Sequence, residues 1–276
     1  MKSNYLVAAI IAVATSTSLV PVRAGEEASA EAAASSVSGS FSLGINSHHM
    51  SSGRDIWGDG SGFHDVQYNP MLNLNFDLGN DVTFNIGSWA EFNNDHDPGS
   101  VDGNDFQEID FWAGVSFAAG AIDVSLSYQE WIYADDSERI LDVTIGGLDL
   151  PLDPTLKFHG RLDEGAAADT SGPTAGTSHD TGIVASLSAS LPGFSFAGLD
   201  FAVPVSVAFA TDGYHGGDSG YAYSSIGLST SVPLTGPWAL SAGLTYYLTN
   251  DDVIPPAAGN ADDNILTGGI SIGMSF

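Results

Sequence analysis

Charged side chains alternate with neutral ones along two short stretches of the sequence. In "KFHGR", Lys157, His159 and Arg161 are spaced two residues apart, and in "EID" the acidic pair Glu108 and Asp110 has the same spacing. Side chains two residues apart point to one side of a β-strand. The first stretch therefore predicts a strand with a positive face, and the second predicts a strand with a negative face.

Opposite charges that face each other across a narrow space create a transverse electric field. Such a field orients polar solutes and sets the preference between ions in a pore. A second interpretation stays open, in which the same charges neutralise one another and brace the wall that carries them. Under both interpretations the candidate pore-lining residues are Glu108, Asp110, Trp112, Asp123, Asp142, Lys157, His159 and Arg161.

Glu130 and Arg139 form a candidate ion pair on the opposite, apolar face. Alternation places Glu130 beside Tyr128 and places Arg139 on the same face, across a short link. An isolated charge on a lipid-facing surface is costly except near the interface, so we predict that the two residues pair at the outer rim. A β-bulge that redirects the Glu130 side chain is the alternative.

Histidines and acidic loops raise the question of metal binding. The imidazoles of one predicted rim could bind a transition metal, but their spacing matches no defined site, and no metal site or cofactor is predicted. Two oxygen-rich stretches, 59–65 and 97–105, do not fit the EF-hand pattern, and only weak binding of divalent cations by the acidic loops stays open. The histidines concerned are His48, His49, His64, His96, His179 and His215.

Nothing in the sequence points to catalysis. No outward serine is expected beside an outward histidine, and "GGDSG" at 216–220 lacks the histidine and aspartate context of a serine protease. We therefore predict that the chain is not an enzyme. Aromatic residues instead suggest a lipid-interface girdle at the outer rim, including Trp131, Tyr133 and Tyr223, while alternation turns Trp89 and Tyr247 inward.

The same alternation recurs along most of the chain and predicts an all-β protein. The links between the expected strands are tight near 79–80, 119–120 and 235–237, and longer polar links such as 51–69 and 164–179 lie between them. Short periplasmic turns and longer outer loops are typical of outer-membrane barrels, and a soluble β-sandwich would not require them. The expected strands are 38–50, 70–79, 81–92, 106–118, 121–133, 139–149, 154–163, 180–191, 199–211, 220–233, 238–249 and 264–276.

The predicted fold is a 12-stranded antiparallel, up-and-down transmembrane β-barrel with acidic outer loops, formed by residues 37–276 as one domain. Closing the last strand against the first would remove both edges of the sheet. Residues 1–24 have the charged start, apolar core and small C-terminal residues of a cleaved signal peptide, and 25–36 are a low-complexity, flexible lead-in. These features predict export to the bacterial outer membrane.

Composition limits the possible partners. The chain has 34 acidic and 6 basic residues, with a formal net charge of −28, so nucleic acid is excluded as a partner. Only 14% of its residues are charged, which suits a barrel with an apolar exterior in contact with outer-membrane lipid.

Several stretches resemble the TorF-family porins and related outer-membrane proteins of Gram-negative bacteria. They are "FQEIDFWAGVSF" (106–117), "VSLSYQEWIYADDSERILDVTIG" (124–146), "LTYYLTNDDVIP" (244–255) and the closing strand. The resemblance implies an outer-membrane pore and brings no catalytic residues. A C-terminal strand that ends on Phe276 also resembles the end that the barrel assembly machinery reads, so this machinery is an implied partner.

Twelve strands enclose a lumen between the packed interior of eight-stranded barrels and the wide channel of porins. We therefore predict a porin-like channel for passive diffusion of small polar solutes. Its acidic loops favour cations or neutral solutes over anions. A non-conducting outer-membrane barrel with a ligand-binding or structural role is the alternative.

Overall fold

A computed structural model describes residues 36–56, 62–93, 101–102, 105–133, 137–163, 181–255 and 264–276. The predicted signal peptide, 1–24, and almost all of the predicted lead-in, 25–36, lie outside the described residues. Within these ranges we found no helix that is long and apolar enough to cross a membrane.

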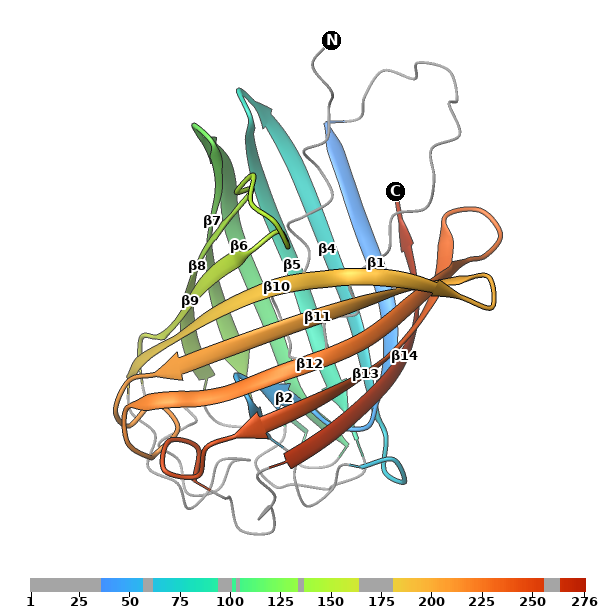
Figure 1. The fold of residues 1–276 in the computed structure, drawn as a ribbon. Coiled ribbons are helices and arrows are strands. Elements are labelled where there is room, and N and C mark those ends of the chain that lie inside the picture. Colours follow the sequence, from blue (N-terminus) through green and yellow to red (C-terminus); the bar gives the residue numbers. More distant parts are fainter. Residues whose placement is uncertain are drawn as a thin grey trace.

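Twelve strands close into one antiparallel barrel, in which each strand pairs with its neighbours in the chain and β1 pairs with β14 (Figure 1). The prediction of a 12-stranded antiparallel barrel is confirmed. The remaining two strands, β2 (Met50–Ser51) and β3 (Arg54–Asp55), form a separate hairpin. The barrel strands are β1 (Val37–Asn46), β4 (Gln67–Gly79), β5 (Val82–Phe92), β6 (Phe106–Ala119), β7 (Ile122–Ile132), β8 (Ser137–Gly146), β9 (Thr155–Arg161), β10 (Gly182–Phe196), β11 (Leu199–Ala210), β12 (Gly220–Pro233), β13 (Trp238–Thr249) and β14 (Asn264–Ser275).

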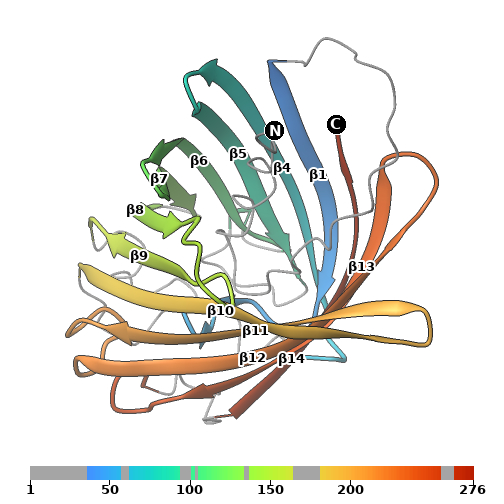
Figure 2. The ribbon, with the colours of Figure 1, turned by 45° about the horizontal axis from the view of Figure 1, so that its top comes forward.

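The ring closes where the first and last strands meet (Figure 2). The register runs from Ser40 opposite Ser275 to Asn46 opposite Gly269. Two reciprocal backbone hydrogen bonds extend it, because Gly39 N donates to Phe276 O at 2.8 Å and Phe276 N donates to Gly39 O at 3.0 Å. Closure leaves no strand edge with unpaired backbone groups, which a spanning sheet requires.

Alternation gives the wall an apolar outer face and a polar inner face. Large apolar side chains remain exposed on the outside, and such a continuous band is the surface that a barrel presents to lipid. The inward positions between them carry Ser, Thr, Asn, Gly and charged residues. The exposed side chains include Phe41, Leu43, Leu72, Phe111, Leu126, Leu187, Ile226, Leu228, Leu240, Leu244, Ile270 and Ile272.

The two ends of the barrel differ in how the strands are joined. At the short-turn end, where β1 begins, Asn80 and Asp81 both have positive φ (55° and 59°) in the link between β4 and β5. This is the backbone of a two-residue hairpin turn, which Asn and Asp tolerate. The described parts of the longer links, including 47–56 and 62–66, lie at the other, long-loop end, which we predict to face outward.

Several strand boundaries differ from the sequence prediction, and two differences change the architecture. Strand β10 does not end at residue 191 but continues to Phe196 through a register shift between Leu191 and Phe194. Pro192 lies within this shift, where its missing N–H removes no ladder hydrogen bond. The link expected at 51–69 also contains the β2–β3 hairpin, which no periodic pattern indicated.

Gly39 gives a test of the closing seam. A Cβ at this position would lie 2.8 Å from the Asn73 carbonyl oxygen and 2.6 Å from Phe276 Cζ. The carbonyl belongs to the β1–β4 ladder and cannot move cheaply, so we expect Gly39→Ala to lower the free energy of unfolding by about 1–3 kcal/mol. Urea unfolding of the folded barrel in detergent measures this change.

Gly146→Ala is the matched control for this substitution. Its added Cβ would meet only Thr155 Oγ1, at an ordinary 3.6 Å. The control should therefore change the free energy of unfolding by less than about 0.5 kcal/mol. Equal stability of the two variants would contradict a tightly packed seam.

Candidate functional site

The lumen is lined differently in its two halves. In the short-turn half, inward serines such as Ser125, Ser231 and Ser241 are half-buried. In the long-loop half, inward charged groups are buried, and Glu91, Glu108 and Asp142 are at most 1% exposed. The long-loop half is therefore filled with side chains, and the charged residues of interest lie in this filled part.

The first charged cluster surrounds Asp142 on β8. Its carboxylate lies 2.9 Å from Lys157 Nζ and 2.6 Å from His159 Nδ1, both from the neighbouring strand β9. It also accepts a hydrogen bond from Gln129 on β7. The strand register places Asp142 opposite His159, so alternation alone turns these predicted residues into the lumen together.

Arg161 pairs with Glu138, which was not among the predicted pore-lining residues. Its Nε lies 2.9 Å from Glu138 Oε2, its Nη1 donates to the Tyr214 carbonyl oxygen at 2.7 Å, and its guanidinium lies 4.3 Å above the Tyr214 ring. Glu138 was expected in a link, but β8 begins at Ser137. Glu138, Ile140 and Asp142 are spaced two residues apart, and this spacing could have placed Glu138 on the inner face of the strand.

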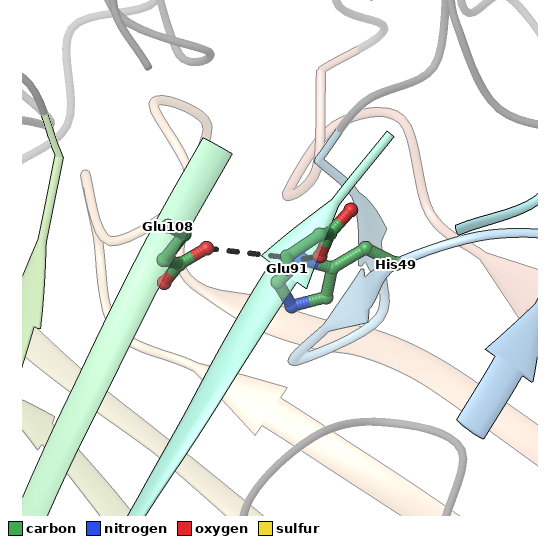
Figure 3. Close-up of side chains that lie close together, drawn as sticks. All are labelled: His49, Glu91 and Glu108. Atoms are coloured by element: carbon green, nitrogen blue, oxygen red, sulfur yellow. Dashed lines mark ion pairs between the residues drawn. The ribbon is translucent and has the colours of Figure 1, made fainter. Parts of the chain in front are cut away.

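The second cluster gathers carboxylates from β5 and β6. Glu91 and Glu108 project from these neighbouring strands toward His49, which precedes β2 (Figure 3). His49 Nδ1 lies 2.6 Å from Glu91 Oε2 and 3.8 Å from Glu108 Oε2. Tyr133 donates its hydroxyl to Glu108 Oε1 at 3.0 Å, and Asn93 donates its amide to Glu91 Oε1 at 3.3 Å.

The electrostatics of this cluster favour a positively charged imidazole. Burial alone would lower the pKa of His49, but the negative charge of Glu91, followed by those of Glu108 and Asp55, outweighs burial and raises the pKa to about 9. At neutral pH, His49 therefore carries a proton and offsets part of the buried negative charge.

The β2–β3 hairpin lies between these clusters and fills the lumen. Met50 is 1% exposed and packs against Tyr247 and Ile265 of β13 and β14. At the hairpin turn, a Cβ on Gly53 would lie 2.2 Å from the Tyr223 ring of β12. The hairpin thus contacts walls opposite to the strands that carry Glu91 and Glu108.

Little space remains beside the hairpin. Arg54 is 5% exposed, and burial, together with the nearby positive charge of Arg161, lowers its pKa to about 10. A cavity of ≈ 20 Å³ remains between the hairpin and the wall, lined among others by His49, Glu108 and Tyr133. Such a volume holds about one water molecule, so this conformation offers no wide path through the long-loop half.

The structure therefore separates the predicted pore-lining residues. Glu108 and Asp110 lie in the β5–β6 wall with the His49 cluster, whereas Lys157 and His159 contact Asp142. Trp112 is inward and donates its Nε1 proton to Asn73 Oδ1 at 3.1 Å. Asp123 lies near the short-turn end, where its carboxylate is close to Gly147, outside both clusters.

The residues predicted as an outer-rim pair are neighbours across β7 and β8. Glu130 is opposite Arg139 in the register, and Arg139 Nε lies 4.0 Å from Glu130 Oε1. Arg139 also binds Asp163 at 3.0 Å. Both members are partly exposed, at 54% for Arg139 and 41% for Glu130, so this pair is solvated unlike the buried clusters.

Three aromatic residues expected in the outer girdle lie inside instead. Trp131 is opposite Asp110 and Glu138 in the register, which fixes it on the inner face, and its ring is 5.4 Å from His159. Tyr133 is 6% exposed and binds Glu108, and Tyr223 packs against the hairpin cluster. The expectation for these three residues was wrong because it weighed aromatic type above alternation.

Two features with a superficial likeness to hydrolase sites have structural roles. Ser47 Oγ lies 2.7 Å from His48 Nδ1, but Ser47 is 2% exposed and its Oγ accepts the Gly268 N–H at 2.8 Å. A G-x-S-x-G pattern spans 269–273, but these residues form part of β14 and not a strand-to-helix turn. The absence of enzymatic activity stays a prediction.

The COG4313 outer membrane channel from Pseudomonas putida F1 superposes with a TM-score of 0.52 at 12% sequence identity, covering 92% of this chain and 100% of the channel. The chain shares its fold with this channel. The KdgM porin covers 86% of this chain and 99% of its own at 7% identity and a TM-score of 0.44.

A third similar structure is the outer membrane phospholipase A from Escherichia coli, at 11% identity and a TM-score of 0.41, covering 86% of this chain and 92% of its own. No protein-family model matches the chain, and no curated protein matches it. The TorF-family resemblance therefore stays a prediction, and the similarity extends to the fold alone.

Arg161 and Arg139 provide a test of the buried cluster. Arg161→Met removes a guanidinium from a pair whose members are 7% and 3% exposed, and leaves Glu138 buried without its partner. We expect this substitution to lower the free energy of unfolding by about 3–5 kcal/mol in a urea titration.

Arg139→Met removes the same chemical group from the exposed pair. Because solvent screens that pair, the loss should stay below about 1 kcal/mol. A loss at Arg161 no larger than that at Arg139 would show that the lumenal pair is solvated in solution.

Proposed function

We propose that this protein is a narrow outer-membrane channel for small polar solutes that favours cations and neutral solutes over anions. The observation that carries the proposal is the polarity of the lumen. Inward positions in the short-turn half carry hydroxyl and amide side chains such as Ser125, Ser241 and Asn85. A barrel that only needed a filled core would bury apolar side chains there.

The charge of the lumen supports the preference for cations. Among the described residues, six buried carboxylates stand against two buried guanidinium groups. Even with His49 and Lys157 counted among the basic groups, acidic groups outnumber basic ones, six against four, along the path. A narrow, water-excluding passage amplifies this imbalance, which attracts cations and repels anions. The six are Asp55, Glu91, Glu108, Asp110, Glu138 and Asp142, and the two are Arg54 and Arg161.

The hairpin determines how such a channel would conduct. It occupies the long-loop half in the described conformation, so a solute passes only if the hairpin shifts or if small ions and water thread along its polar edges. Met50 packs in the cluster with Tyr247 and Ile265, and the other hairpin side chains are the polar or charged Ser51, Ser52, Arg54 and Asp55. Polar side chains exchange their contacts with water more readily than an apolar plug does.

A non-conducting barrel is the second candidate. It is favoured by the same filled half of the lumen, where the remaining cavity of ≈ 20 Å³ accommodates about one water molecule. In this case the polar short-turn half would serve as a binding pocket or the barrel would have a structural role.

Planar-bilayer recordings distinguish the two candidates. We expect small, steady conductance from the purified protein. Replacing Met50–Asp55 by a Gly–Ser segment of equal length, which keeps His49, should raise the single-channel conductance at least threefold because it empties the lumen. A correctly folded barrel that stays silent with and without the hairpin would support the non-conducting candidate.

Ion preference is tested by two substitutions of opposite sign. Asp142→Asn removes a negative charge from the lumen, and Lys157→Met removes a positive one. In a KCl gradient, the first should shift the reversal potential toward lower cation preference and the second toward higher. Anion preference in the unmodified channel would refute the selectivity part of the proposal.

A further inference from the structure

We infer that His49, Glu91 and Glu108 form a binding site for one divalent transition-metal ion, with Zn²⁺ as its representative. The three residues each offer one ligand atom, and these atoms lie within 4.8 Å of one another in a buried position. The site does not depend on the proposed conduction of solutes, because an ion bound here would stay coordinated between the barrel wall and the segment that leads into the hairpin.

The orientation of the two carboxylates carries the inference. Each glutamate uses Oε1 to accept a hydrogen bond from a neutral donor, Tyr133 for Glu108 and Asn93 for Glu91. Each turns Oε2 toward His49 Nδ1, as Figure 3 shows. Both Oε2 atoms are buried, and apart from their contacts with His49 neither has a hydrogen-bond partner among the described residues. Anchored carboxylates with one free oxygen aimed at a common point are typical of metal ligands.

A further layer of contacts supports these ligands. Asn93, which holds Glu91, accepts a hydrogen bond from Gln107 Nε2 at 2.6 Å. The His49 ring packs against Trp89, with 4.9 Å between ring centroids. Outer contacts of this kind fix ligand orientation and raise affinity in known metal sites.

The distances require only a small adjustment. Ligands about 2.1 Å from a tetrahedral zinc lie about 3.4 Å from one another. The separation of His49 Nδ1 from Glu91 Oε2, 2.6 Å, is shorter than this, and its separation from Glu108 Oε2, 3.8 Å, is longer. An ion would therefore displace the Nδ1 proton of His49, which leaves to solvent, push His49 away from Glu91 and draw in Glu108. The neighbouring cavity, lined by His49 and Glu108, has room for a water as the fourth ligand.

Charge balance favours a divalent ion over the imidazolium alone. Asp110 follows Glu108 on the same face of β6, is 3% exposed, and has an Oδ1 without a hydrogen-bond partner among the described residues. Three buried acidic groups thus lie close together on two neighbouring strands, and one imidazole contacts two of them. The mixed nitrogen and oxygen ligands favour zinc and similar metals over Ca²⁺ and Mg²⁺, which prefer oxygen alone.

Calorimetric titration of the EDTA-treated, full-length barrel with ZnCl₂ in detergent tests the site and needs no conduction. We expect one high-affinity site, with the affinity at least tenfold weaker in His49→Ala and in Glu108→Gln. His48→Ala is the matched control, because His48 contacts Ser47 and Phe63 and lies outside the ligand set. Its zinc affinity should stay within twofold of the original.

The melting temperature with and without zinc provides a second measurement, which remains informative if a ligand variant is less stable than the unmodified protein. Zinc should raise the melting temperature of the unmodified protein and of His48→Ala by several degrees, and should leave that of Glu108→Gln unchanged. Equal zinc affinity in the unmodified protein and both ligand variants would overturn the site. Displacement of zinc by a tenfold excess of Ca²⁺ would also overturn the assignment to a transition metal.

Discussion

Closure of the sheet into a ring is the constraint on which the rest of this structure depends. Once β1 pairs with β14, every second side chain of each strand must enter the lumen, whatever its chemistry. Twelve strands give a lumen too wide for the wall side chains alone to pack as in an eight-stranded barrel. The charged clusters and the inserted hairpin are the means by which this chain fills one half of that space.

The same type of interaction has different consequences on the two faces of the wall. Arg161 and Glu138 are sequestered from water, so removal of either charge leaves the other without solvation. Arg139 and Glu130 lie on the outer face and share their charge with Asp163 and solvent. Position in the alternation, and not residue type, decides whether an ion pair is part of the structural framework.

The barrel could be predicted from the sequence because apolar and polar residues alternate through long segments such as β4 and β14. A two-residue period indicates a β-strand and not a helix. It also placed Lys157, His159 and Asp142 on the inner face. It missed the β2–β3 hairpin because two strands of two residues each carry no periodic signal. It missed Glu138 because strand ends are poorly defined by pattern, and a shift of two residues turned a loop residue into a lumenal one.

The grouping of His49 with Glu91 and Glu108 could not be read from spacing. His49 lies 42 and 59 positions away from these residues along the chain, and they meet only because the segment after β1 turns back into the ring. Tertiary insertion of this kind depends on the width of the lumen, which is set by all twelve strands together. The residue pattern of any one strand therefore cannot predict this insertion.

The contacts of Met50 also constrain the order in which this chain can fold. Its packing partners, Tyr247 and Ile265, belong to the last two strands, about two hundred residues further along the chain. The hairpin therefore lacks these packing partners while the nascent barrel is still open. The contact spans a long stretch of chain, so its loop-closure entropy is offset only after β13 and β14 have joined the sheet. Insertion of the hairpin is thus a late event, and an unfinished barrel passes through a stage with an unobstructed lumen.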